Sequence, residues 1–292
     1  MIDRIKEALR CVAPHGLVEQ RRNKYRKQLE EERQRFHEER RDRINRAAVE
    51  RGETRVAGVP DYNAMISFLK SRGLPEEHLR DGTIPPGSLA FIIAEVSDLL
   101  PPAPAEGYLG LHVGNFVGIS LATVTGILAS LHPSSVTVSI DPNLTHRGID
   151  HPQDHVLALL SQFHLQSHSL VIGGYSTSKS ISNDGVTFAD YDPATAFATE
   201  VACENCLASL GRFSAGKFHL VLVDGNHEGD YVARELKALA PLLAKGAILI
   251  MDDINAAWDE IASIFASLEN YGFETGPSDG RVGLAIYKGL KV

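Results

Sequence analysis

Acidic residues follow two apolar runs of the sequence, at positions where carboxylates could bind a cation. Asp224 comes directly after the run 218–223, and Asp252 and Asp253 come directly after the run 247–251. If both runs are parallel strands of one sheet, their carboxyl ends lie at the same edge, and the three carboxylates repel one another. A hard divalent ion with oxygen ligands relieves that repulsion. These residues therefore predict a Mg²⁺ site; the alternative is that the acids only order loops at helix N-termini.

A glycine-containing loop follows the run 108–113 and is typical of a segment that binds a ligand through its backbone. Gly114 and Gly118 are four residues apart, which lets the chain turn tightly while helix N–H groups face the ligand. The loop has neither the dinucleotide fingerprint Gly-x-Gly-x-x-Gly nor the Gly-Lys-Ser/Thr of a phosphate-binding loop. It indicates a ligand near this strand end without identifying it.

Two further strand ends could contribute to a nucleoside site. Asp141 follows the run 136–140, where an acidic side chain can accept both hydrogen bonds of a ribose diol. Alternatively, Asp141 only begins the turn at Pro142. Gly174 and Ser176 follow the next apolar run and would flank an adenine ring.

The elements that must position these residues follow from the alternation of apolar runs and helical periods after residue 108. This alternation predicts an α/β fold with a Rossmann-like, doubly wound parallel sheet that has helices on both faces. Strands are expected at 108–113, 136–140, 169–172, 218–223 and 247–251, and helices at 119–131, 153–164, 193–210, 229–243 and 255–270. The runs 273–275 and 282–287 are too close for an intervening helix and predict a terminal antiparallel hairpin.

The charge of the chain is unevenly distributed, which predicts parts of different character. The 292 residues carry a net charge of −8. Residues 1–55 hold 16 Lys and Arg against 11 Asp and Glu, a charge of +5, so the remainder carries −13. We expect a basic helical arm at 1–55, a helical cap and linker region at 56–105, and the α/β domain at 106–292.

The arm could contact a partner or a surface. Residues 19–50 contain no Gly or Pro and are rich in helix formers. Their sparse apolar residues allow either a solvated helix or a two-stranded coiled coil. Residues 2–22 mix apolar and basic side chains, as segments on an anionic membrane surface do, although a dimer contact or docking onto the body fits equally. We expect a homo-oligomer formed through this helix, with peripheral membrane contact as the alternative.

The composition excludes several classes of protein. No stretch approaches the roughly 18 apolar residues of a membrane-spanning helix, and the first residues lack the apolar core of a signal peptide. Three cysteines do not make a disulfide scaffold. We expect a cytoplasmic protein, and the acidic body argues against nucleic acid as a partner.

Taken together, these motifs resemble the class I S-adenosylmethionine-dependent methyltransferases. The resemblance is carried by residues 109–120, by Asp141 and above all by residues 221–231 and 241–253, and it covers residues 106–292. Within the class, the chain is most similar to the bacterial group whose fourth strand ends in Asp-Gly-Asp-His-Ser-Tyr-Glu. Catechol and macrocin-type sugar O-methyltransferases look similar at the same strand ends.

The resemblance implies a cofactor and a set of contacts with it. Gly114 and Gly118 would line the methionine part of S-adenosylmethionine, Asp141 would bind its ribose, and Asp224 would lie beside the methyl group. Most members carry an acidic residue at the position of His112, where it helps to position the amino end of the cofactor. Together with the residues expected from their places in the loop and at the strand ends, the full set of expected cofactor contacts is His112, Gly114, Asn115, Gly118, Ser120, Asp141, Gly174, Ser176 and Asp224.

The resemblance also implies a reaction. Catechol and macrocin-type enzymes hold Mg²⁺ with one acid after the fourth strand and two groups after the fifth, which Asp224, Asp252 and Asp253 match in position. The acceptor would be a hydroxyl of a sugar, glycan or secondary metabolite, selected by the helices at 61–100. A bound metal would lower the pKa of that hydroxyl, or His227 would accept its proton as general base, so that His227 and Asp224 are the expected catalytic residues.

Two other functions stay open at this point. The protein could methylate nitrogen or oxygen of another small molecule without a metal. It could also be a catalytically inactive methyltransferase fold that serves as a binding or membrane-associated scaffold, which the departure at His112 favours.

Overall fold

The computed structural model describes residues 58–177, 205–214 and 216–290. The chain divides into two units, Met1–Arg51 and Gly52–Val292, and every described residue belongs to the second. The predicted basic arm at residues 1–55 therefore lies outside the described residues, as does most of the helix expected at 193–210.

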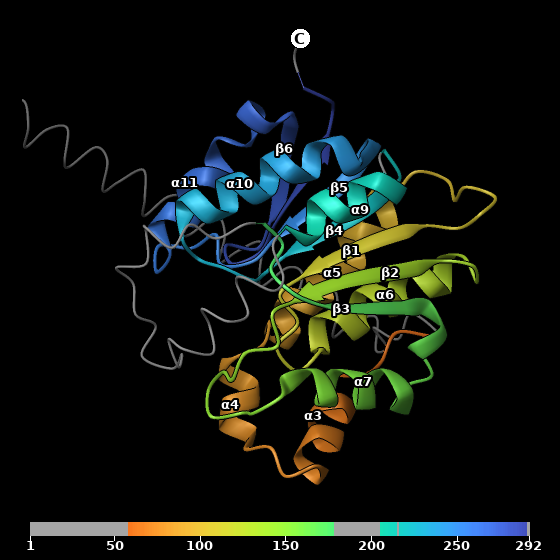
Figure 1. Cartoon of the computed structure of the whole chain (residues 1–292), viewed down its shortest axis with the longest axis vertical. Helices are drawn as coiled ribbons and strands as arrows, with labels where there is room; N and C mark the ends of the chain where they lie inside the picture. The colour runs from red at the N-terminus through yellow and green to blue at the C-terminus, as the bar shows by residue number, and fades with distance from the viewer. Residues whose placement is uncertain (1–57, 178–204, 215, 291–292) are drawn as a thin grey trace, which may run out of the picture. The chain divides into compact units, whose positions relative to one another are not determined.

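Seven strands form one mixed sheet with the order β3-β2-β1-β4-β5-β7-β6 (Figure 1). The first five strands are parallel, and β7 lies antiparallel between β5 and β6. The strands are β1 (Leu109–Val113), β2 (Val136–Asp141), β3 (Ser169–Gly173), β4 (Phe218–Val223), β5 (Leu243–Met251), β6 (Phe273–Ser278) and β7 (Gly283–Tyr287). This order confirms the predicted Rossmann-like sheet with a terminal antiparallel hairpin.

Helices cover both faces of the sheet. On one face, α5 packs against α6 and β5, while α6 packs against β1 and β2. On the other face, α9, α10 and α11 lie in front of the sheet in the view of Figure 1. The described helices are α3 (Tyr62–Ser71), α4 (Glu76–Asp81), α5 (Pro86–Leu99), α6 (Ile119–Leu131), α7 (Pro152–Gln162), α9 (Cys206–Ser214), α10 (Gly229–Leu239) and α11 (Asp259–Ala266), with 3₁₀ turns η1 (Gln166–His168), η3 (Ala240–Leu242) and η4 (Leu268–Tyr271).

The two-residue period of β1 sorts its side chains between these faces. Leu111 and Val113 belong to the hydrophobic cluster that also contains Leu236 of α10. Gly110 and His112 alternate with them and therefore face α6. His112 is fully buried, so this departure from the family pattern lies inside the protein, between the sheet and α6.

Of the predicted helices that lie wholly within the described residues, two differ from their predicted bounds by four residues. The helix expected at 229–243 ends at Leu239, because Pro241 cannot donate the backbone hydrogen bond that the helix needs. As a result β5 begins at Leu243 rather than at residue 247. The helix expected at 255–270 is shorter, since α11 begins at Asp259 and η4 follows it.

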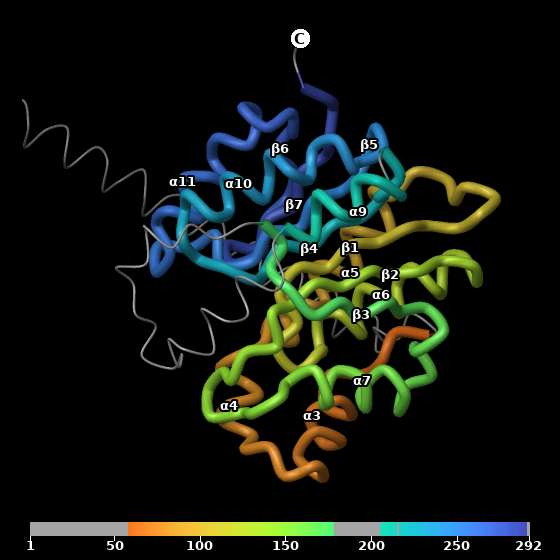
Figure 2. Tube along the Cα trace, viewed as in Figure 1, coloured from red at the N-terminus to blue at the C-terminus, as the bar shows by residue number. Residues whose placement is uncertain are grey.

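The helices before the first strand have different positions. The side chains of Phe91 and Ile92 are buried and anchor α5 in the helix layer on one face of the sheet, beside α6 and β5. By contrast, α3 packs against α7 (Figure 2), where Phe68 and Phe163 make an edge-to-face contact with ring centroids 6.4 Å apart. None of the helices that the structure describes is both long and apolar enough to cross a membrane.

The terminal hairpin brings the loop before β7 to the end of β5. In the antiparallel pairing of these strands, Met251 lies opposite Gly283. Arg281 precedes Gly283 by two residues and therefore lies beside the residues that follow Met251. The backbone N–H of Ile254 donates to the carbonyl of Arg281 over 2.9 Å, so the hairpin fixes a basic residue at the acidic strand end.

Candidate active site

The glycine loop between β1 and α6 lies directly on the end of β4. Gly114 has φ +87°, and a Cβ at this position would lie 2.0 Å from the carbonyl oxygen of Asp224. Gly118 has φ +92° and precedes the first residue of α6. Both positions therefore require glycine, the first because the backbone of β4 approaches so closely and both because their φ is positive.

Asp141, at the end of β2, holds this loop through backbone hydrogen bonds. Its Oδ2 accepts the N–H of Asn115 at 2.6 Å and that of Phe116 at 3.4 Å, and its Oδ1 accepts the N–H of Asn143 at 2.7 Å. Burial raises the pKa of Asp141, while these N–H groups lower it. The bond to Asn143 agrees with the expectation that Asp141 begins the turn at Pro142. Asp141 also binds the N–H groups of the glycine loop, which that expectation did not include. Its contact with a ribose stays a prediction.

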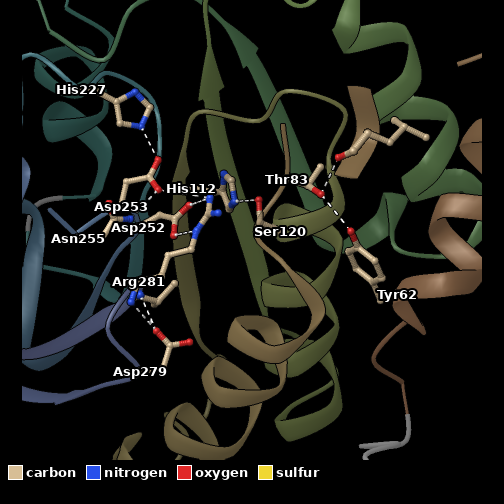
Figure 3. Close-up of polar contacts among 12 residues, drawn as sticks. Tyr62, Thr83, His112, Ser120, His227, Asp252, Asp253, Asn255, Asp279 and Arg281 are labelled. Atoms are coloured by element: carbon tan, nitrogen blue, oxygen red, sulfur yellow. Dashed lines mark hydrogen bonds and ion pairs between the residues drawn. The ribbon is translucent and has the colours of Figure 1, made fainter. Parts of the chain in front are cut away.

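His112 and Ser120 form a buried pair under the loop (Figure 3). The Nε2 of His112 lies 3.0 Å from the Oγ of Ser120. Burial lowers the pKa of His112 to about 3, opposed in part by the Asn115 side chain, so the imidazole is neutral at pH 7. Its Nδ1 and the Oδ1 of Asn115 have no hydrogen-bond partner among the described residues. Because His112 is enclosed, any effect on a cofactor would act through Ser120 or the loop backbone.

The residues after β3 differ in what they contact. Gly174 donates its N–H to the carbonyl of Asp141 over 2.9 Å, which ties the ends of β2 and β3 together. Ser176 donates a hydrogen bond to the buried carboxyl of Glu235 on α10 and lies 3.1 Å from the hydroxyl of Tyr231. The Ser176 hydroxyl is thus engaged inside the protein, and the adenine contact proposed for it stays untested.

Asp224, His227 and Asp253 form the polar centre of the site. Within the described parts of the chain, they are the one group of acidic, histidine or cysteine side chains that could hold a metal, with their ligand atoms within 4.8 Å of one another. The Nε2 of His227 lies 3.0 Å from Oδ2 of Asp253 (Figure 3), and the His227 ring stacks on Trp258 at a centroid distance of 4.2 Å. Asp253 has φ 55°, a left-handed conformation that strains a non-glycine residue.

Asp252 does not belong to this group, in contrast to the predicted Mg²⁺ ligands Asp224, Asp252 and Asp253. Its side chain turns to Arg281, whose Nε donates to Oδ1 over 3.0 Å and whose Nη2 donates to Oδ2 over 2.8 Å. The same Nη2 lies 3.4 Å from Oδ1 of Asp253. The structure therefore brings together two of the three predicted carboxylates, adds His227 to them, and pairs the third with a guanidinium.

The electrostatics of these residues reflect their crowding. Burial raises the pKa of Asp224 well above its usual range, the charges of Asp252 and Asp253 add to this rise, and Arg281 opposes it. Burial also acts to raise the pKa of Asp253, but the hydrogen bond from His227 and the charge of Arg281 outweigh it and lower the pKa. Three carboxylates face one guanidinium, so two negative charges are in excess when all are ionised.

Three residues of this region have no counterpart among the predicted site residues. Arg281 could have been found from the topology, because antiparallel pairing of the last strand with β5 brings the hairpin loop to Asp252. Trp258 follows the acidic pair closely in sequence, but its contact with His227 depends on the path of the loop before α11. Glu235 has no local signal, since it meets Ser176 only through the packing of α10.

Comparisons with known proteins agree with this architecture. Residues 111–254 match the family model described as "Methyltransferase domain". No curated protein is significantly similar to the chain in sequence. Among solved structures, cofactor-bound Rv0187 from MTB is 14% identical, with 81% of this chain and 93% of that chain covered and a TM-score of 0.50.

Two further solved structures have similar coverage. An O-methyltransferase from Bacillus cereus in complex with SAH is 13% identical, covering 80% of this chain and 94% of that chain, with a TM-score of 0.49. A methyltransferase from Geobacter sulfurreducens is 15% identical, covering 84% and 96%, with a TM-score of 0.47. The family match, the sheet order and the glycine loop lead to one conclusion: residues 111–254 belong to a methyltransferase-domain family, and the sheet has the fold of the class I S-adenosylmethionine-dependent methyltransferases.

Proposed function

We propose that this methyltransferase transfers the methyl group of S-adenosylmethionine to a hydroxyl oxygen of a small molecule, such as a saccharide or a secondary metabolite. One observation carries the proposal: the loop expected to bind the cofactor meets the polar centre at Asp224. The carbonyl of Asp224 closes against Gly114, while its side chain belongs to the group with His227 and Asp253. A methyl donor in the loop and an acceptor at the polar centre would therefore be neighbours.

The reaction itself needs alignment and one proton transfer. The acceptor oxygen forms a bond to the methyl carbon as the carbon–sulfur bond breaks, and the electron pair of that bond stays on sulfur. An in-line displacement of this kind depends mostly on holding the reacting atoms in line. The hydroxyl must also lose its proton, and the groups at the strand ends of β4 and β5 are the candidates to receive or release it.

A divalent cation fits the donor set of the polar centre. Two carboxylates and one imidazole would hold it, and the excess negative charge would be neutralised. Magnesium was the ion expected from carboxylates alone, but an imidazole ligand favours ions such as Mn²⁺ over Mg²⁺. When bound, such a cation lowers the pKa of an alcohol that coordinates it.

A metal-free version of the same reaction is favoured by one contact. The Nε2 of His227 lies 3.0 Å from Asp253, which is the arrangement in which a carboxylate orients a histidine that acts as general base. Stacking on Trp258 fixes the plane of the ring. In this version Nδ1 of His227 accepts the proton of the hydroxyl.

The experiment that tests the proposal has two stages. Binding of S-adenosylhomocysteine (SAH), the demethylated product, is first measured by calorimetry; absence of binding at millimolar concentration contradicts the cofactor assignment and favours an inactive scaffold. Methyl transfer from labelled S-adenosylmethionine is then followed over a panel of sugars, phenols and amines. Labelling of amines but not of hydroxyl compounds would contradict the choice of oxygen.

Chelation separates the two versions of the mechanism. If EDTA abolishes transfer and Mn²⁺ restores it, the cation takes part. If transfer survives EDTA but is lost in His227→Gln, the histidine acts as base without a metal. The Asp230→Asn variant changes an exposed acid at the start of α10 and is the matched control. It should show the same activity, and the same response to EDTA and Mn²⁺, as the unchanged protein.

A further inference from the structure

Arg281 is held at the end of β5 by hydrogen bonds of its backbone and of its guanidinium group. Asp279 accepts the backbone N–H of Arg281 over 2.9 Å and that of Val282 over 2.8 Å. The carbonyl of Arg281 accepts the N–H of Ile254. Figure 3 shows the side chain extending from this turn toward Asp252. The guanidinium is therefore positioned by the backbone of the hairpin and not only by its ion pairs.

Arg281 engages both carboxylate oxygens of Asp252. Nε and Nη2 of Arg281 meet one carboxylate oxygen each, at 3.0 and 2.8 Å, which is the bidentate pairing that suits a guanidinium best. The Asp252 side chain is almost fully buried, at 1% exposed. A cation at Asp252 would have to share an oxygen that already accepts an Arg281 N–H, next to the positive guanidinium and in a site with little access to water.

Asp253 differs from Asp252 in this respect. Its contact with Arg281 is a single one, 3.4 Å from Nη2 to Oδ1, and its Oδ2 points to His227. A cation could therefore replace the proton between His227 and Asp253 while the arginine stays in place. Asp252 and Asp253 are adjacent in the sequence, but only Asp253 has a carboxylate oxygen that does not accept a hydrogen bond from Arg281.

We propose that Arg281 withholds Asp252 from cation binding and so limits the cation site of this enzyme to Asp224, His227 and Asp253. The inference deepens the proposed function, because it specifies the ligands of the cation in that proposal. It also explains why the third ligand in this chain would be a histidine: the residue that would otherwise complete a three-carboxylate site is already neutralised by a permanent positive charge.

Binding of Mn²⁺ to the full-length protein, measured by calorimetry and by electron paramagnetic resonance, tests this assignment without an activity assay. The variants are Asp252→Asn, Asp253→Asn, Arg281→Met and the double variant Arg281→Met with Asp252→Asn. The Arg212→Met variant removes an exposed arginine of α9 and is the matched control. SAH binding reports whether each variant is folded, and Arg281→Gln, which also removes the guanidinium charge, replaces Arg281→Met if that variant does not fold.

The expected result is a specific pattern. Asp252→Asn leaves the Mn²⁺ affinity within about twofold of the unchanged protein, while Asp253→Asn lowers it on the order of tenfold or more, as loss of a ligand does. Arg281→Met raises the affinity roughly tenfold, because it frees a carboxylate and removes a positive charge. Adding Asp252→Asn to Arg281→Met cancels that gain.

Failures of the two proposals are distinguishable. If the unchanged protein does not bind Mn²⁺ but Arg281→Met does, the withholding role of Arg281 is supported and the cation version of the mechanism fails. If Arg281→Met binds no better than the unchanged protein, or if Asp252→Asn weakens binding as much as Asp253→Asn, the inference is overturned. If the inference about Arg281 fails but methyl transfer persists in EDTA, the proposed methyltransferase activity is still supported.

Discussion

Asp253 connects the two halves of the strand-end cluster. One of its oxygens lies 3.0 Å from His227, and the other lies 3.4 Å from both Arg281 and Asn255. Its left-handed backbone conformation is maintained against strain. Asp253 is therefore a position at which a substitution should change the rate of methyl transfer and leave the affinity for the cofactor unchanged.

We expect Asp253→Asn to lower kcat by about 100-fold, the effect of losing a general base or its partner. The amide keeps the shape of the side chain but removes the charge that orients His227 or binds a cation. The affinity for SAH should stay within about twofold, because the side-chain hydrogen bonds and ion pairs of Asp253 go to His227, Asn255 and Arg281 and not to the glycine loop. Kinetics and calorimetry on one preparation check both values, and an equal loss in both would instead assign Asp253 to cofactor binding.

Glu235 is the second residue with a measurable signature. It is fully buried on α10 and accepts a hydrogen bond from Ser176, while its Oε2 has no hydrogen-bond partner in the described part of the chain. Burial raises the pKa of Glu235 from 4.5 to about 7, although the bond from Ser176 opposes the rise. The protonated carboxyl is thus the form that the native structure favours.

The pH dependence follows from the sign of this shift. Because the folded state binds the proton more tightly than the unfolded state, the stability from this group is complete below pH 4.5 and is lost as the pH rises through 7. The loss is about 3 kcal/mol. Glu235→Gln should therefore gain stability relative to the unchanged protein between pH 5 and pH 8 in urea denaturation. Glu269→Gln, an exposed control, should show no such trend.

At the scale of elements, the glycine loop and the end of β4 depend on each other. A methyl group at Gly114 would collide with the Asp224 carbonyl, 2.0 Å away, whereas a Cβ at Gly148 would meet nothing within 4 Å. Both glycines have positive φ, +87° and +70°. The pair therefore separates the cost of backbone conformation from the cost of steric overlap.

We expect Gly148→Ala to cost about 1 kcal/mol, the penalty of a left-handed conformation for alanine. Gly114→Ala should cost more than about 3 kcal/mol or displace the loop from β4. SAH binding should then be lost in Gly114→Ala and kept in Gly148→Ala. Retained SAH binding and stability in Gly114→Ala would mean that the loop does not need this close contact.

The elements themselves could be predicted from local pattern. Apolar runs of three to six residues located every described strand to within four residues, since a buried strand leaves this signal in the sequence. The boundary of β5 was missed because the helical period continued past Pro241, whose effect on the backbone outweighs the apolar pattern. Which helix covers which face could not be read from the sequence.

The candidate site was predictable only where it depends on strand ends. The positions of Asp141, Asp224 and Asp253 at one edge of the sheet were predicted correctly, because each follows an apolar run that forms a parallel strand. The choice between Asp252 and His227 was not predictable, because it depends on which acid the hairpin arginine reaches. Long-range contacts between side chains, such as that of Ser176 with Glu235, leave no periodic signal in a single sequence.

For the whole molecule, the division of charge suggests that two units have separate tasks. The unit Gly52–Val292 contains the sheet, the glycine loop and the polar centre, and Met1–Arg51 forms the other unit. The excess acidity of residues 56–292, a charge of −13, includes the carboxylates around the expected sulfonium cofactor. Residues 1–55 supply none of the expected cofactor-binding, metal-binding or catalytic residues, so we propose that they mediate association between copies of the chain rather than catalysis.

Deletion of residues 1–55 tests that division. The remaining chain keeps every described strand and helix, so its SAH affinity should stay within about twofold of the full-length value. Its sedimentation coefficient should fall to that of a monomer, if the full-length protein associates through a coiled coil. Equal sedimentation of the two proteins would contradict the proposed association.

A point variant distinguishes the two ways in which the arm could act. Replacing Leu29 and Phe36 by Gln in the full-length chain disrupts the sparse apolar stripe but keeps all 16 basic residues of the arm. A coiled coil depends on the apolar positions and should dissociate in this variant. An association driven by charge between the basic arm and the acidic body should persist and weaken with added salt, because screening acts on exposed charges. Sedimentation of the variant at low and at high salt therefore decides between them.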